Sequence, residues 1–182
     1  MNKCIEYERK FTLTFQQFNT YMEFFAQRAT PDIINQINYY YDDSSFIVHS
    51  RGETLRVRQT GEKLVMEHKY DKSRSGDMSI SKEAATPISQ LPVSIKIDGL
   101  KTNLIGTLMT NRCDFEINDI KLSLDRSFYL GTVDYELEIE TQGDIVLPDF
   151  MQELVNGNAV SPMGKFCRFV SRLRQMDEIY EI

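Results

Sequence analysis

The chain has 182 residues, a length that suits one domain with a sizeable core, and we expect residues 1–182 to form a single domain. Its content of 41% hydrophobic and 26% charged residues is ordinary for a soluble globular protein. The net charge of -6 argues against a general nucleic-acid binder, which is normally basic. No apolar run of about 18 residues occurs, which argues against a membrane-spanning helix and a membrane partner.

The cysteines are odd in number and widely spaced, at Cys4, Cys113 and Cys167, and no Cys-x-x-Cys pair occurs. A disulfide framework and a zinc knuckle are therefore not expected. Together with an N-terminus that lacks a hydrophobic signal core, this predicts a reducing, cytoplasmic location. The absence of Gly-x-x-x-x-Gly-Lys-Ser/Thr and Gly-x-Gly-x-x-Gly excludes the P-loop and dinucleotide-binding motifs.

The first half of the chain predicts one helix among several strands. A strand is expected over residues 1–14, followed by a helix over 15–28 for which Thr14 is the N-cap. A tyrosine-rich strand is expected over 36–43. Alternating segments bounded by glycine or polar residues predict four further short strands, at 46–49, 53–59, 63–70 and 78–84. Residues 87–92 predict a helical turn or a loop.

The second half of the chain continues the strand-rich pattern. Residues 95–110 fit a helix or a strand, because Leu104 and Leu108 lie four residues apart whereas two glycines weaken a helix. Three strands follow, at 112–117, 120–126 and 132–141. Helices are expected over 148–155 and 165–176, on either side of a loop rich in glycine and proline. Many antiparallel strands with few helices indicate an α+β fold, and closure into a barrel would remove unpaired edges.

Several predicted strands carry charges on one face and apolar residues on the other. On the first strand, Glu6, Glu8 and Lys10 alternate with Ile5 and Tyr7. The same alternation recurs later, with Arg56, Arg58, Glu67, Lys69, Lys121, Asp125, Glu136, Glu138 and Glu140. One interpretation is that each charged face meets bulk water. Successive glutamates repel one another without a cation between them, however, so we favour charged faces that converge inside a barrel with helices outside.

The residue types on these faces predict a metal and a phosphorylated ligand. The acids are all oxygen donors and the two histidines, His49 and His68, sit in no ligand spacing, which favours Mg²⁺ or Mn²⁺ over Zn²⁺. Arginine binds phosphate oxygens through its planar fork, and lysine does so as a point charge. Acids, a metal and several bases together indicate a ligand that carries several phosphates.

Short charged motifs follow one another in a set order along the chain. Glu6-Tyr7-Glu8-Arg9-Lys10 opens it, in the pattern Glu-x-Glu-x-Lys. The later motifs are Tyr39-Tyr40-Tyr41-Asp42, Leu55-Arg56-Val57-Arg58, Met66-Glu67-His68-Lys69, Lys82-Glu83, Arg112, Leu124-Asp125-Arg126, Tyr135-Glu136-Leu137-Glu138-Ile139-Glu140 and Gly164-Lys165-Phe166. This ordered set resembles the CYTH superfamily, the triphosphate tunnel metalloenzymes, over nearly the whole chain.

The resemblance implies an eight-stranded antiparallel barrel that binds a triphosphate in its lumen. It implies metal ligands on the first and late strands, without choosing among the last three: Glu6, Glu8, Asp125, Glu136, Glu138 and Glu140. It implies a set of substrate-binding residues, namely Lys10, Arg56, Arg58, Glu67, Lys69, Arg112 and Lys165. The catalytic candidates are Glu6, Glu8 and Glu138, of which Glu6 or Glu138 would take a proton from the attacking water.

The function expected from the resemblance is hydrolysis of the terminal phosphate of a triphosphate, with Mg²⁺ or Mn²⁺ as the cofactor. Inorganic triphosphate is the preferred substrate because no nucleobase pocket is evident in the sequence, although thiamine triphosphate and nucleoside triphosphates stay open. Two alternatives are a class IV adenylyl cyclase and a module that binds polyphosphate or a nucleotide without turnover. A homodimer is plausible, but no residue pattern argues for one.

Overall fold

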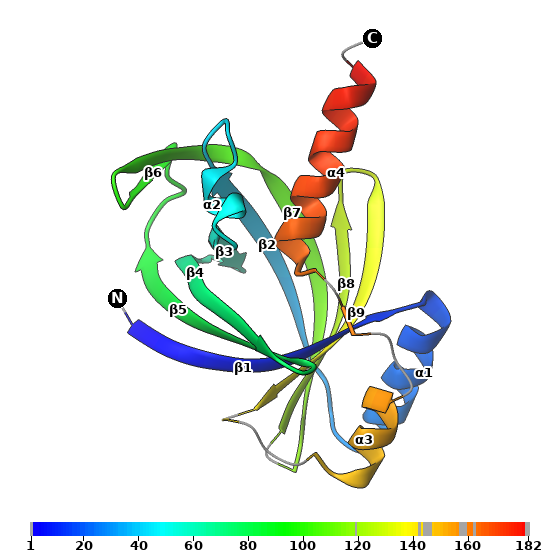
Figure 1. Ribbon diagram of the computed structural model, residues 1–182. Coiled ribbons are helices and arrows are strands. Elements are labelled where there is room, and N and C mark those ends of the chain that lie inside the picture. Colours follow the sequence, from blue (N-terminus) through cyan, green and yellow to red (C-terminus); the bar gives the residue numbers. More distant parts are fainter. Residues whose placement is uncertain are drawn as a thin grey trace.

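A computed structural model describes residues 2–118, 120–141, 143, 147–156, 160–161 and 163–180. Within them, eight strands form a closed antiparallel barrel, which confirms the fold expected from the sequence (Figure 1). These strands are β1 (Asn2–Leu13), β2 (Asp32–Asp42), β3 (Thr54–Thr60), β4 (Lys63–Ser75), β5 (Met78–Ile88), β7 (Leu100–Ile117), β8 (Ile120–Tyr129) and β9 (Thr132–Thr141). Pairing of β2 with β7 closes the ring, and the short β6 (Ser94–Ile97) pairs with β7 beyond it.

The strand register sets charged residues of neighbouring strands side by side on the inner face of the barrel. Lys10 of β1 lies opposite Glu138 of β9, and Arg112 of β7 lies opposite Asp125 of β8. Because side chains alternate along a strand, a slip of one residue would turn all these charges outward. The apolar residues between them form the outer face, and they need helices to cover them.

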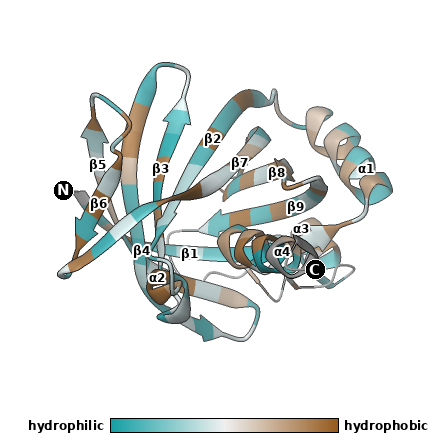
Figure 2. Cartoon of the chain, turned by 90° about the horizontal axis from the view of Figure 1, so that it is seen from above, coloured by the Kyte–Doolittle hydropathy of each residue, from teal (hydrophilic) through white to brown (hydrophobic). Residues whose placement is uncertain are grey.

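The described helices are α1 (Phe15–Ala26), α2 (Ile47–Ser50), α3 (Asp149–Asn156) and α4 (Lys165–Tyr180). The predicted cap of α1 is confirmed, because the Thr14 hydroxyl accepts a hydrogen bond from the Gln17 backbone N–H. Figure 2 shows α1 outside the ring of strands, where Phe25 joins a core with Phe11 and Leu137. None of the described helices is both long and apolar enough to span a membrane.

The helix α4 begins beside β2 and β7 and projects beyond one end of the barrel (Figure 1). Its Phe169 ring packs against Tyr40 of β2 and Tyr129 of β8, with ring centroids 5.2 and 6.2 Å apart. Gly106 of β7 leaves room for this ring, since a Cβ there would lie 2.6 Å from Phe169 Cζ. The glycine that weakens a helix in the sequence pattern is therefore the point where α4 approaches β7.

Replacing Gly106 with Ala is expected to lower the free energy of unfolding by roughly 1–3 kcal/mol, because the new Cβ displaces the Phe169 ring. The backbone φ of 153° at Gly106 adds to the cost. Denaturant unfolding measures the change. Gly164→Ala is the control, because its Cβ would meet no atom within 4 Å, and it should cost less than about 1 kcal/mol. Wild-type stability in Gly106→Ala would contradict the close approach of α4.

The strand predicted at residues 46–49 is wrong, since this segment forms the helix α2. The Asp42 carboxylate accepts hydrogen bonds from the backbone N–H groups of Val48 and His49, and the Asp43 carboxylate accepts one from Ile47. These bonds satisfy N–H groups that a short helix leaves free at its start. Two aspartates at the end of β2 therefore outweigh the local β-branched residues.

The segment 95–110, for which a helix and a strand were both expected, forms the hairpin of β6 and β7. Asp98 and Gly99 both have positive φ angles, of 46° and 79°, as a two-residue Asp-Gly hairpin turn requires. The strand β7 then runs for 18 residues and includes the strand predicted at 112–117. For residues 87–92 a helical turn or a loop was expected: 87–88 end β5, and 89–92 form a loop with no helical turn. Within the loop predicted between the last two helices, residues 157–159 and 162 lie outside the described residues.

Candidate functional site

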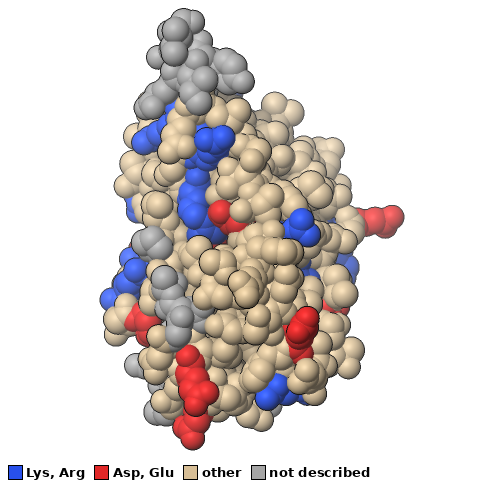
Figure 3. Space-filling view, turned by 90° about the vertical axis from the view of Figure 1, so that its right-hand side faces the viewer, with Lys and Arg blue, Asp and Glu red and all other residues tan. Residues whose placement is uncertain are grey.

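The barrel contains a cavity of about 410 Å³, and all eight of its strands and α4 contribute lining residues. The basic lining residues are Lys10, Arg56, Arg58, Lys69, Lys72, Arg74, Arg112, Lys121 and Lys165. The acidic lining residues are Glu6, Glu8, Asp77, Asp125, Glu138 and Glu140. Bases thus outnumber acids in the cavity although the chain as a whole has a net charge of -6, which indicates an anionic ligand. Figure 3 shows that basic side chains also gather in a band on the surface at the α4 end.

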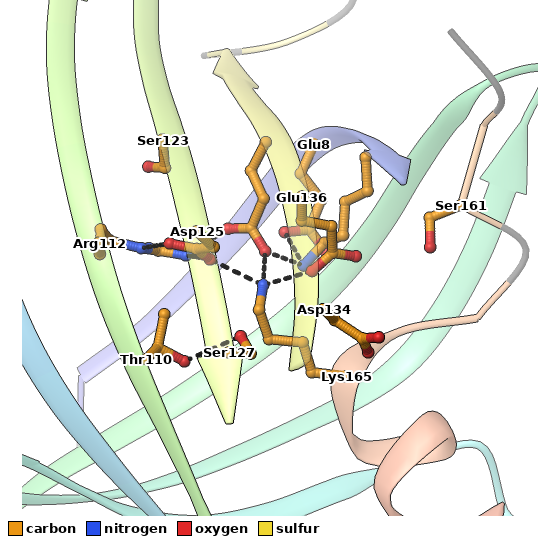
Figure 4. A network of polar contacts seen from close by, with 12 residues as sticks. Glu8, Thr110, Arg112, Ser123, Asp125, Ser127, Asp134, Glu136, Ser161 and Lys165 are labelled. Carbon is orange, nitrogen blue, oxygen red and sulfur yellow. Dashed lines mark hydrogen bonds and ion pairs between the residues drawn. The ribbon is translucent and has the colours of Figure 1, made fainter. Parts of the chain in front are cut away.

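Three carboxylates from β8 and β9 meet inside the barrel. Asp125, Glu136 and Glu138, here called the acidic cluster, place one oxygen each within 4.8 Å of one another. Lys165, in the first turn of α4, places its Nζ 2.7 Å from Asp125, 2.6 Å from Glu136 and 2.5 Å from Glu138 (Figure 4). Because Asp125 and Glu136 are buried, their charges require a partner, and Lys165 supplies it.

Two further cations converge on Glu138. The Lys10 Nζ lies 3.0 Å from Glu138 and 3.0 Å from Glu8, while the Arg112 Nη2 lies 2.5 Å from Glu138 and 2.6 Å from Asp125. Burial alone would raise the pKa of Glu138, but Lys10 and the other two cations outweigh burial and hold this pKa well below its usual range. Glu138 is therefore ionised at neutral pH and joins the acidic cluster to the basic wall of the cavity.

A second charged group lies where β1, β4 and β5 meet. The Lys69 Nζ contacts the Glu6 carboxylate and lies 3.5 Å from Glu83 and 3.9 Å from Glu8. Burial raises the pKa of Glu83. The positive charge of Lys69 opposes this shift, and the negative charge of Glu6 adds to it. Burial acts in the same direction on Glu6, but there Lys69 outweighs it and lowers the pKa. Glu83 is therefore a better proton acceptor than Glu6.

A third group holds the two arginines of β3. The Arg56 Nε lies 2.6 Å from one oxygen of Glu67, and the Arg58 Nη1 lies 3.5 Å from the other. The Arg58 Nε also donates a hydrogen bond to the side-chain oxygen of Asn38. Burial lowers the pKa of Arg58, and the neighbouring charge of Arg56 lowers it further. Glu67 thus orients both arginines while it compensates the charge of Arg58 only in part.

All six predicted metal ligands lie in the described residues, and the structure gathers three of them into the acidic cluster. Glu8 is linked to that cluster through Lys10, which contacts both. Glu6 belongs instead to the group around Lys69. Glu140 lies at the rim, with its side chain 51% exposed and 3.9 Å from Lys121. The predicted bases and Glu67 line the cavity or contact residues that do.

Two residues beside the cavity, Tyr40 and Arg168, were not among the predicted site residues. The Tyr40 hydroxyl is buried in the cavity wall and has no hydrogen-bond partner among the described residues. Arg168 of α4 contacts Glu136 at 3.0 Å and Asp134 at 2.8 Å, behind the acidic cluster. Alternation along β2 is a signal that could have found Tyr40, because Asn38, two residues before it, faces Arg58. Arg168 lies one helical turn after Lys165, a spacing that places the two on one helix face.

The acidic cluster fits a divalent cation. Its donors are all carboxylate oxygens, which Mg²⁺ and Mn²⁺ prefer, and they already converge on one cation, the Lys165 ammonium. A metal ion held by the acidic cluster and the neighbouring Glu8 would compete with that ammonium. Lys165 would then be free to contact an anion in the cavity.

Comparison with known proteins places the chain beside one family. The model of the CYTH domain matches residues 4–162. A protein of Bacillus subtilis (strain 168), YjbK, whose name proposes a triphosphatase, is 29% identical over 151 residues. The match covers 77% of this chain and 79% of YjbK.

Two solved structures resemble the barrel closely. HpAC1 from Hippeastrum, described as a proposed adenylyl cyclase with a dominant triphosphatase activity, has a TM-score of 0.74 at 20% identity, and the match covers 91% of this chain and 95% of that one. A proposed adenylate cyclase from Bacillus halodurans has a TM-score of 0.72 at 23% identity and covers 93% and 99%. At these identities both establish the fold alone.

Proposed function

The chain belongs to the CYTH domain family, and from this we propose that it hydrolyses the terminal phosphate of a triphosphate with Mg²⁺ or Mn²⁺. Inorganic triphosphate is the substrate proposed. The observation that carries the proposal is a cavity rich in Arg and Lys, with a buried acidic cluster in its wall. The names of YjbK and HpAC1 support the same reaction class.

The basic wall would bind the phosphates. Arg56, Arg58 and Arg112 offer guanidinium groups that match phosphate oxygens, and the charge of Arg58 is only partly compensated in the protein. The buried Tyr40 hydroxyl would donate a hydrogen bond to a phosphate oxygen, which would give it the partner it lacks. These side chains would neutralise the equatorial oxygens of the transferred phosphoryl group.

The acids would divide two tasks. When bound, a divalent ion would neutralise phosphate charge and help to position water. Glu138, with its low pKa, suits a metal ligand better than a base. Glu6, which lines the cavity, would be the stronger base of the two earlier candidates, because the pKa of Glu138 is held further down. Lys165, once displaced from the acidic cluster, would contact the terminal phosphate.

A phosphate-release assay tests the proposal. Purified protein with Mg²⁺ or Mn²⁺ should convert tripolyphosphate into pyrophosphate and phosphate, and a chelator should abolish release until excess Mn²⁺ restores it. With ATP, cyclic AMP and pyrophosphate would identify a cyclase, whereas ADP and phosphate would identify a hydrolase. Thermal stabilisation by tripolyphosphate with no product from any triphosphate would overturn the hydrolase and leave a binding module.

A further inference from the structure

A further basic region lies where the cavity opens beside α4. Its lining residues, here called the α4 mouth, are Thr54, Lys72, Arg74, Ser161, Gly164 and Cys167. The Lys72 Nζ donates a hydrogen bond to the Thr54 hydroxyl at 2.9 Å, and the Arg74 Nη2 donates one to the Ser161 carbonyl oxygen at 3.1 Å. Both acceptors are neutral, so neither bond compensates a positive charge.

The cations of the α4 mouth differ from those deeper in the cavity. Lys10, Lys69 and Lys165 each contact two or more carboxylates. Lys72 and Arg74 form no ion pair with any carboxylate among the described residues. The α4 mouth therefore presents two positive charges that an anion could bind without first breaking an ion pair.

The surroundings of Lys72 weaken its hold on a proton. Although Lys72 as a residue is exposed, partial burial of its ammonium, together with the charges of Lys69 and Lys10, lowers its pKa to about 8. The titratable groups around it are Cys167 of α4, Glu8 and Lys10 of β1, His49 of α2 and Lys69 of β4. An anion bound beside the Lys72 ammonium would stabilise its charged form and raise its pKa again.

The α4 mouth continues the row of bases on β3. Arg58, Arg56 and Thr54 lie on the same face of that strand, two residues apart, and Lys72 is hydrogen-bonded to Thr54. The Lys72 ammonium therefore continues the row of positive charges on β3 by one position, or roughly 7 Å, beyond Arg56. Among the described residues, the aromatic rings that line the cavity are those of Tyr40 and Phe166. Both are buried, and they pack against each other with ring centroids 4.8 Å apart. Phosphate thus finds charges here, while a nucleobase finds no exposed ring on which to stack.

We propose that Lys72 and Arg74 form an outer phosphate subsite, which binds one phosphate beyond those held by Arg56 and Arg58. The preferred ligands are then unsubstituted linear oligophosphates of more than three phosphates. This proposal rests on the proposed function, since it assumes that the deeper cavity binds phosphates, and it names the substrate feature that the α4 mouth selects.

Calorimetric titration at pH 7 without divalent ions tests the subsite, because this readout requires no turnover. Wild-type protein should bind tetrapolyphosphate about 10-fold more tightly than tripolyphosphate. Lys72→Met should bring the two affinities within about twofold of each other and leave tripolyphosphate binding nearly unchanged. Lys72→Arg, which keeps the charge, should retain the preference. In wild type the preference should decline from pH 7 to 9 as Lys72 loses its proton, and in Lys72→Arg it should persist.

Two results would overturn the subsite: equal loss of affinity for both ligands in Lys72→Met, or an unchanged preference for tetrapolyphosphate. A wild type that binds both ligands with the predicted preference but releases no phosphate would keep the subsite and reject the proposed hydrolysis. A wild type that hydrolyses tripolyphosphate but binds both ligands with equal affinity would keep the proposed hydrolysis and reject the subsite.

Discussion

Replacing Glu138 with Gln is expected to lower kcat/KM for triphosphate hydrolysis about 100-fold or more, whereas Glu140→Gln should change it less than about threefold. Both residues face inward along β9. The Glu138 carboxylate contacts Lys10, Arg112 and Lys165, and it belongs to the acidic cluster. The Glu140 side chain is 51% exposed and lies outside that cluster. The first change therefore alters a carboxylate of the acidic cluster, and the second removes a rim charge.

The two variants are matched in strand, residue type and change of charge. Phosphate release at limiting and saturating substrate gives kcat/KM and kcat for each, and thermal melts show whether the fold is retained. Similar activities for Glu138→Gln and Glu140→Gln would contradict the assignment of Glu138 to the site.

Replacing Lys165 with Met is expected to lower the free energy of unfolding by roughly 3–5 kcal/mol at pH 7 in the presence of a chelator. The substitution leaves the acidic cluster without the cation that lies between its three carboxylates. Mg²⁺ should restore more stability to the variant than to the wild type, because the ion takes the place of the ammonium. Lys165→Arg, which keeps a positive charge, is the control and should lose much less. Denaturant unfolding with chelator or with Mg²⁺ measures both effects.

The loss in Lys165→Met should also shrink as the pH falls. In the wild type the pKa of Glu138 is depressed, so this carboxylate contributes stability that is present above its unfolded-state pKa and lost as the pH falls through its folded-state pKa. Without Lys165 the pKa of Glu138 rises, and protonation relieves the repulsion at a higher pH. A Lys165→Met protein with wild-type stability at pH 7 and no response to Mg²⁺ would contradict the role of the cluster.

Alternation predicted most of the barrel because each strand needs one apolar and one charged face. Its eight-stranded closure depended on the family resemblance, since the pairing of β2 with β7 joins segments far apart in the chain. The alternation of residues predicted the wrong element, or missed a contact, where a side-chain hydrogen bond or a glycine determined the backbone conformation. Asp42 starts the helix α2 by accepting backbone hydrogen bonds, and Gly106 serves a contact with Phe169 that the sequence alone does not show.

The site was predictable in composition but not in grouping. The charges on the strand faces predicted an ionic cavity, yet three glutamates on one face of β9 look alike in the sequence. Strand register and the position of α4 separate them, because Lys165 reaches Glu136 and Glu138 while Glu140 lies at the rim. Simple alternation from Lys69 does not place Lys72 in the cavity, because an irregularity between Tyr70 and Ser73 of β4 shifts the face on which the side chains lie.

A crystal structure with Mn²⁺ and a slowly hydrolysed triphosphate analogue tests the central claim most directly, namely that side chains from separate strands bind a polyanion and a metal inside the barrel. The predicted result is an anomalous Mn²⁺ peak bound by Asp125, Glu136 and Glu138, with the phosphates against Arg56 and Arg58. An analogue and an ion bound only on the outer surface, with solvent alone in the cavity, would contradict it.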